Sequence, residues 1–181
     1  HGTEAGVAEQ IESVRAISDE FGGADFSWAS RPEERSKLWQ ARHDAAHSCN
    51  ALRPGCVLWA TDVCVPISRL AECIHETKKD LATASMPAPL VGHVGDGNFH
   101  LCFIIDPDKP EEMAEAQTLN GRLIDRALDM DGTCTGEHGV GLGKIAYMER
   151  EHGEGISVMR AIKKTLDPDN IMNPGKIISM N

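Results

Sequence analysis

Hydrophobic residues recur every three to four positions in several stretches of the chain, as they do on one face of an amphipathic helix. In the first stretch Val7, Ile11, Val14 and Ile17 share such a face, and two glycines follow it as a stop signal. Two other stretches open with a proline and nearby glutamates, which is typical of helix N-termini. The pattern predicts helices over residues 3–21, 32–48, 67–84, 111–130, 144–152 and 154–166.

Shorter apolar stretches, bounded by glycine or proline and rich in β-branched or aromatic residues, predict strands. They cover residues 25–30, 56–65, 88–94 and 99–106, and a fifth strand from residue 132 runs into the glycine-rich loop of GTCTGEHGVGLG. Since only a glycine turn separates 88–94 from 99–106, these two strands form a hairpin, and the sheet is at least partly antiparallel. The prediction is a single α+β domain over residues 1–181, with helices packed on one face of the sheet.

The composition narrows the range of partners. The formal net charge of −10 argues against nucleic acid or an anionic membrane as the main partner, so an anionic substrate needs a local cationic site. No run of 18 apolar residues occurs, and no transmembrane segment is expected. The six cysteines form no C-x-x-C pair and mostly neighbour aliphatic residues, which favours reduced thiols and a cytoplasmic location.

The stretch GHVGDGNFH places His93 and His100 on either side of the predicted hairpin turn. If residues 95–98 form a four-residue loop, His93 lies directly opposite His100, and both side chains point to the same face. Two imidazoles in that arrangement can bind one metal ion, at about 2.0–2.1 Å for zinc. The alternative is that both histidines only hydrogen-bond to backbone carbonyls, and a one-residue change of register would separate them.

A third ligand is available in GTCTGEHGVGLG, where Glu137 follows a strand and precedes several glycines. Two histidines and one carboxylate suit a catalytic zinc, manganese or iron ion, and these residue types do not choose among the three metals. Taken alone, Glu137 could be a surface carboxylate. The stretch HDAAH also places His43 and His47 four residues apart, as in zinc proteases, but Asp44 replaces the glutamate of that signature and an exposed helix face is favoured.

Four stretches in order, TDVCVPISRL, GHVGDGNFH, GTCTGEHGVGLGK and LDPDNIMNPGK, together resemble the C-terminal part of the FAD-linked oxidases of the vanillyl-alcohol-oxidase type. The likeness covers essentially the whole chain and is greatest to the D-lactate dehydrogenases that reduce a cytochrome. Glycolate oxidase flavin subunits and D-2-hydroxyglutarate dehydrogenases are more distant members. The resemblance implies a ferredoxin-like α+β domain that contributes to the oxidation of a 2-hydroxy acid.

The resemblance also implies roles for individual residues. It assigns His93, His100 and Glu137 as metal ligands and the next histidine, His138, as the catalytic base. Two further residues take roles from their motifs: Arg42 of LWQAR is expected to bind the substrate carboxylate, and Asn173 of NPGK is expected to approach the flavin. Without the resemblance, Arg42 would be expected only to pair with a surface acid such as Glu34.

The FAD-binding domain of this family lies upstream of the matched region, so the chain is expected to be the substrate half of a two-domain enzyme, inactive by itself. Its expected partners are the upstream FAD domain, a small 2-hydroxy acid and an electron acceptor such as a cytochrome or quinone. The expected location is cytoplasmic or peripheral to the inner membrane, and mitochondrial in a eukaryote.

Three positions bear on the substrate. The resemblance to the D-2-hydroxyglutarate dehydrogenases implies a threonine, a lysine and an asparagine at three positions. This chain has Ala46, Ala60 and Cys102 there. A distal carboxylate would lose polar partners there, which favours a short or apolar 2-hydroxy acid. Two other functions remain open: a freestanding metal-dependent hydrolase that activates water with the same three ligands, and a non-catalytic metal-binding module.

Overall fold

The computed structural model describes residues 2–180. The chain divides into two compact units, residues 1–45 and residues 46–181, and each unit is described by itself. The prediction that the whole chain forms one domain of a longer protein stays a prediction.

The first unit consists mainly of two helices, α1 (Glu4–Glu20) and α2 (Pro32–His43). Helix α1 begins after Thr3, whose hydroxyl accepts a hydrogen bond from the Gly6 N–H at 3.2 Å, a normal N-cap. The strand predicted over residues 25–30 is wrong, since that segment has no regular structure. The helix predicted over 32–48 is interrupted at Asp44, and a separate helix α3 (Ala45–Asn50) follows.

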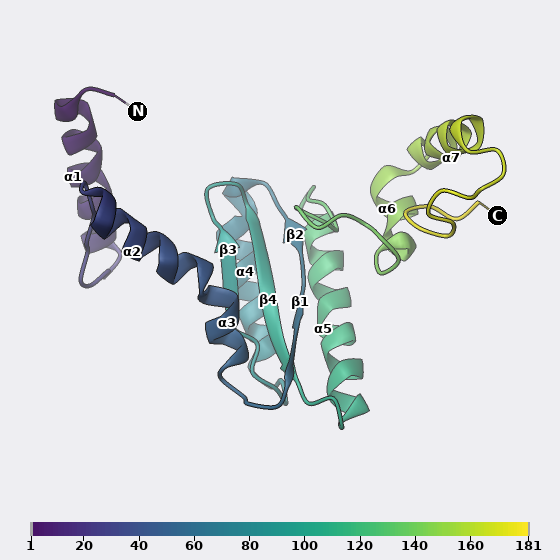
Figure 1. Cartoon of the computed structure of the whole chain (residues 1–181), viewed down its shortest axis with the longest axis horizontal. Helices are drawn as coiled ribbons and strands as arrows, with labels where there is room; N and C mark the ends of the chain where they lie inside the picture. Colours follow the sequence, from purple (N-terminus) through teal and green to yellow (C-terminus); the bar gives the residue numbers. More distant parts are fainter. Residues whose placement is uncertain (1, 181) are drawn as a thin grey trace. The chain divides into compact units, whose positions relative to one another are not determined.

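The second unit is built on a four-stranded antiparallel sheet with β4 (Asn98–Ile105) in its centre, as Figure 1 shows. β1 (Val57–Ala60) and β2 (Val63–Cys64) pair with β4 in one continuous register, so they lie one after the other along the same edge. β3 (Leu90–His93) pairs with the opposite edge. Only residues 61 and 62 interrupt the ladder between β1 and β2.

The order of elements in this unit is that of a ferredoxin-like fold. β1 and β2, which together form one edge of the sheet, lead into α4 (Ile67–Leu81), then the hairpin β3–β4, then α5 (Pro110–Asp129). One more strand, beside β2, would complete the fold. The strand predicted from residue 132 is wrong except for a single antiparallel bridge between Cys64 and Thr133, which stands in this position.

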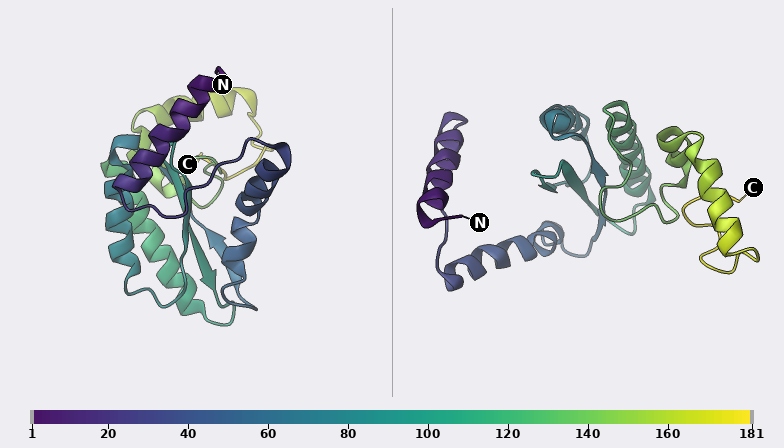
Figure 2. Two further views of the ribbon diagram at one scale, coloured as in Figure 1. Left: turned by 90° about the vertical axis from the view of Figure 1, so that its left-hand side faces the viewer. Right: turned by 90° about the horizontal axis from the view of Figure 1, so that it is seen from above.

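Strand β4 is buried along its whole length because both of its faces are covered. Side chains at alternate positions, from Phe99 to Ile105, pack against α4 and α5, which Figure 2 shows on one side of the sheet. The other face carries His100, Cys102 and Ile104, and α3 packs on it through Cys49. The α+β class is confirmed, with the two long helices on one face.

The chain after α5 continues as a 3₁₀ turn η1 (Ile145–Tyr147) and two helices, α6 (Met148–His152) and α7 (Gly155–Leu166). Met148, Ile156 and Ile178 form a small core of their own between these helices and the tail. Both helices were predicted, and the tail has no strand among the residues described.

Candidate metal and substrate site

The hairpin that carries the two histidines turns at residues 94–97, where the Asp96 N–H donates to the His93 carbonyl at 2.8 Å. Gly97 has a φ of +78°, and a Cβ at this position would lie 2.0 Å from the Val65 carbonyl oxygen. Only glycine allows this backbone conformation together with so close an approach of the neighbouring chain. Glycine at position 97 is therefore required for the turn.

The predicted register of the hairpin is wrong by two residues. His93 pairs with Asn98, and His100 pairs with Val91, so the two histidines are diagonal neighbours and not directly opposed. A shift of two residues keeps every side chain on its original face, whereas a shift of one would reverse it. The prediction that both imidazoles share a face therefore holds for a different pairing.

The structure brings both histidines together with Glu137. His100 Nε2 lies 2.9 Å from Glu137 Oε1, and His93 Nε2 lies 3.5 Å from the same oxygen. The two rings meet edge to face, with centroids 6.0 Å apart. One potential ligand atom from each of the three residues lies within 4.8 Å of the others, and residues 2–180 contain no second group of this kind.

The hydrogen bonds of His100 fit a metal ligand. The Nδ1 atom of His100 lies 2.8 Å from the Thr61 carbonyl oxygen, which can only accept, so Nδ1 carries the proton. In the neutral ring, Nε2 then presents a lone pair to the Glu137 carboxylate. Two lone pairs facing each other need a cation between them, either a second proton on the ring or a metal ion. Fixing the ring by a carbonyl at Nδ1 is the usual support of a metal-bound histidine.

Asp62 is a residue of the site that the sequence analysis missed. It lies in the interruption between β1 and β2, and its side chain is buried. The carboxylate accepts hydrogen bonds from the Asn98 amide at 2.8 Å, the Thr135 hydroxyl at 2.7 Å and the backbone N–H groups of Glu137 and His138 at 3.1 and 2.9 Å. Burial by itself raises the pKa of Asp62, but these hydrogen bonds outweigh it and hold the pKa well below its usual value.

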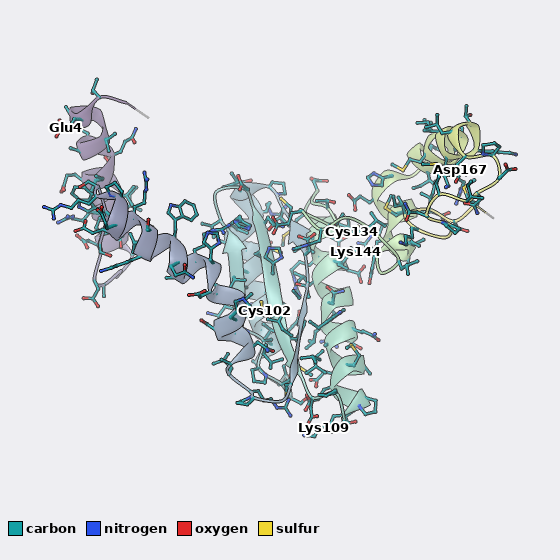
Figure 3. All side chains as sticks on the ribbon, viewed as in Figure 1. Glu4, Cys102, Lys109, Cys134, Lys144 and Asp167 are labelled. Carbon is teal, nitrogen blue, oxygen red and sulfur yellow. The ribbon has the colours of Figure 1, made fainter. Side chains whose placement is uncertain are left out.

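A signal for Asp62 is present in the sequence, since it is the one acidic or basic residue in the apolar run CVLWATDVCV. A charge in a buried strand needs several hydrogen-bond donors, and such a residue is often functional. Lys144 lies beside Asp62. Its ammonium donates to the backbone carbonyls of Asp62 and Cys134, and burial lowers the pKa of Lys144. Figure 3 shows Cys134 and Lys144 beside each other near one end of the sheet, while Lys109 lies at the other end.

The remaining candidate residues occupy three different places. The His138 side chain is 65 % exposed, its Nε2 lies 3.6 Å from Glu137 Oε1, and its ring is 5.4 Å from that of His100. Asn173 lies in the tail, accepts a hydrogen bond from Lys176 Nζ at 3.3 Å, and lines a cavity of about 380 Å³ beside α7. Arg42 belongs to the first unit, where its guanidinium lies 5.5 Å from the centre of the Trp39 ring.

The competing zinc-protease pattern in HDAAH is not supported by the local structure. Helix α2 ends at His43 and α3 begins at Ala45, so the two histidines do not lie one turn apart on one continuous helix. Both of their side chains are exposed.

The sequence of the chain matches, over residues 1–177, the model of a known family described as FAD linked oxidases, C-terminal domain. The chain belongs to this family. The resemblance expected from the four motifs is thereby confirmed, together with the α+β fold of that domain.

Two mitochondrial proteins are among the similar relatives. A probable D-lactate dehydrogenase of Danio rerio is 50 % identical over 99 % of this chain and 36 % of its own length. A D-lactate dehydrogenase [cytochrome] of Arabidopsis thaliana is 49 % identical over 98 % of this chain and 31 % of its own length. A glycolate oxidase subunit of Escherichia coli (strain K12) is more distant, at 30 % identity over 98 % of this chain and 35 % of its own length.

The chain thus spans about a third of the length of the curated relatives it matches. Among residues 2–180, no helix combines the length and the apolar character needed to cross a bilayer.

Proposed function

We propose that this chain is the metal- and substrate-binding part of an FAD-dependent D-2-hydroxy-acid dehydrogenase that acts on a short substrate such as D-lactate. The observation that carries the proposal is the convergence of His93, His100 and Glu137 in a domain of the FAD-linked oxidases. The names of the two mitochondrial relatives support the substrate class and suggest a cytochrome as acceptor and a mitochondrial location.

The donor set suits a divalent ion, because two imidazole nitrogens and one carboxylate leave coordination positions for a substrate. His93, His100 and Glu137 would hold the ion, and Thr61 would keep His100 in the tautomer that binds through Nε2. A bound zinc, manganese or iron ion would polarise the substrate hydroxyl and lower its pKa, and FAD held by an upstream domain would accept the hydride.

His138 would then accept the hydroxyl proton. Its imidazole is exposed to incoming substrate, and its Nε2 lies 3.6 Å from a carboxylate oxygen of the neighbouring ligand Glu137. A base in this position lies within reach of a hydroxyl that binds beside the same carboxylate. The backbone of His138 is anchored by its N–H bond to Asp62, which limits the positions that the imidazole can take.

Two further residues complete the proposed reaction. Arg42 would bind the substrate carboxylate through two parallel hydrogen bonds and so fix which face of the substrate meets the flavin. Asn173 would approach the flavin from the tail. Both assignments follow from the motifs of the family, and both residues lie outside the cluster of three ligands.

The strand positions next to the ligands favour a short substrate. Cys102 follows His100 by two positions on β4 and therefore shares its face, and Ala60 is its partner on β1. Burial raises the pKa of the Cys102 thiol to about 11, so this side chain is neutral at physiological pH. Neither residue offers a cation or an amide to a second carboxylate, which supports lactate over a five-carbon diacid.

The first test measures metal in the full-length protein that carries this chain together with its flavin domain. We expect about one divalent ion per chain by elemental analysis, and turnover of D-lactate with reduction of the flavin. His93→Ala should lose the ion and the activity, while His75→Ala, an exposed histidine on α4, should keep both. A protein without a stoichiometric ion, or a His93→Ala variant that retains it, would overturn the metal site.

The same experiment separates the alternatives. A freestanding hydrolase would bind the metal and hydrolyse esters or amides without any flavin, and the family match argues against it. A non-catalytic module would bind the metal in the full-length protein and turn over neither class of substrate.

A further inference from the structure

The interruption between β1 and β2 contacts both parts of the proposed metal site. Thr61 accepts from His100 Nδ1 through its carbonyl oxygen, and Asp62 accepts from the Glu137 and His138 N–H groups through its carboxylate. Two consecutive residues, Thr61 and Asp62, therefore link His100 of the hairpin to a loop that follows them by more than 70 positions in the sequence.

The loop that carries Glu137 is held mainly by hydrogen bonds to side chains. At its start Cys134 is buried, and its N–H donates to the Glu151 carboxylate at 2.9 Å. Residues 133–138 are linked to the sheet by one isolated bridge, between Thr133 and Cys64, and they form no strand. A ladder of hydrogen bonds that would normally fix such a segment is missing, so side-chain bonds have to replace it. Asp62 receives three of these bonds, from Thr135, Glu137 and His138.

The same carboxylate also contacts the histidine strand. Asn98 opens β4 two residues before His100, and its amide donates to Asp62 at 2.8 Å and to the Val63 carbonyl at 3.0 Å. Gly136 allows the loop to come this close, because a Cβ there would lie 1.9 Å from Asn98 Nδ2. Asp62 thus holds the start of the histidine strand and the loop of the carboxylate ligand against each other.

Extending the proposed function, we infer that Asp62 is the positioning residue that sets the third ligand, Glu137, and the base, His138, relative to the two histidines. It is not itself a ligand. Its oxygens accept from the side chains and backbone of neighbouring residues, and its Oδ1 lies 3.8 Å from His100 Nδ1, the nitrogen that faces away from Glu137.

An isosteric substitution separates this role from simple packing. Asp62→Asn keeps the size of the side chain but replaces one acceptor oxygen with an amide donor, which faces the donors of the loop. We expect the affinity for Zn²⁺ or Mn²⁺, measured by chelator competition in the full-length protein, to fall roughly 10- to 100-fold, as when the hydrogen-bonded supports of metal ligands are removed.

A further readout, amide hydrogen exchange, does not depend on turnover. Amide hydrogen exchange of the metal-free variant should be faster at residues 135–138 than in the unsubstituted protein and unchanged in α5. Thr135→Val removes one hydrogen-bond donor to Asp62 and leaves the carboxylate in place, so it should weaken metal binding by roughly threefold. This variant replaces Asp62→Asn in the experiment if Asp62→Asn does not fold. In the catalytic assay, kcat should fall more than KM rises, because His138 is displaced as well.

Glu112→Gln is the matched control. Glu112 is also a buried carboxylate that accepts from a backbone N–H, but it lies at the opposite end of the sheet. The Glu112→Gln substitution should lower stability and leave metal affinity unchanged. If Asp62→Asn and Thr135→Val bind metal as tightly as the unsubstituted protein, the inference is wrong; if the unsubstituted protein binds no metal, the proposed function fails instead.

Discussion

Two buried carboxylates at opposite ends of the same sheet satisfy their charge in different ways. Glu112 at the start of α5 accepts two hydrogen bonds from the Arg53 guanidinium, at 2.6 and 3.0 Å, and one from the Asp106 N–H at 2.9 Å. Asp62 accepts from neutral groups, and its nearest cation, Lys144, lies 3.8 Å from its carboxylate. One charge is neutralised by a cation, and the other is solvated by the protein.

The difference shows what each charge can do for the molecule. A bidentate pair such as Arg53 with Glu112 fixes two side chains and joins the β1 side of the sheet to α5, which stabilises the fold. A carboxylate bound by backbone N–H groups fixes the path of a loop instead, and here that loop carries Glu137 and His138. We therefore expect substitutions at one end to change stability and substitutions at the other to change the proposed metal site.

The largest effect is expected at Gly136, because an added Cβ would lie 1.9 Å from Asn98 Nδ2 and 3.0 Å from Asp62 Oδ1. Gly136→Ala should displace the loop and weaken metal binding by roughly 100-fold, the upper end for loss of support around a ligand. Gly143→Ala is the control, since nothing lies within 4 Å of its Cβ position. Equal metal affinity of the two variants in a chelator titration would contradict the proposal that the close approach of Gly136 to Asn98 positions the metal site.

A smaller effect, on stability, is expected at the other end. Glu112→Gln leaves the Arg53 guanidinium without its bidentate partner, and the melting temperature should fall by roughly 5 °C. Replacing both residues, as Arg53→Met with Glu112→Leu, should recover part of this loss because no unpaired charge remains. Calorimetry of the metal-free proteins measures these melting temperatures. If Glu112→Gln is as stable as the parent, the Arg53–Glu112 pair contributes nothing to stability.

The smallest effect is a dependence of stability on pH. The hydrogen bonds from Arg53 and from the Asp106 N–H lower the pKa of Glu112 to about 2, below the roughly 4.3 of an unfolded glutamate. The contribution of Glu112 is therefore fully present above about pH 5 and is lost as the pH falls toward 2. Between pH 5 and pH 3 the melting temperature of the parent should drop further than that of Glu112→Gln, and parallel curves would contradict this assignment.

Much of the site could be predicted because its signals are local. The two histidines and the glycine turn lie within nine residues, and strand alternation places both imidazoles on one face even when the register is two residues from that expected. The helices were predicted for the same reason, since hydrophobic period and end signals lie within each segment. The failures at 25–30 and at 132 are short segments in which strand propensity is not matched by a pairing partner.

What the amino-acid sequence determined by itself is the α+β succession of elements and the three residues of the proposed metal site, together with the family to which they point. Only the tertiary structure decided the pairing of the hairpin, the tautomer that Thr61 imposes on His100, and the position of Asp62 beneath Glu137. The bonds between Asp62 and the loop join residues 73 to 76 positions apart. No local period encodes contacts of that separation, because they exist only once the sheet and α5 have brought both segments to the same end of the domain.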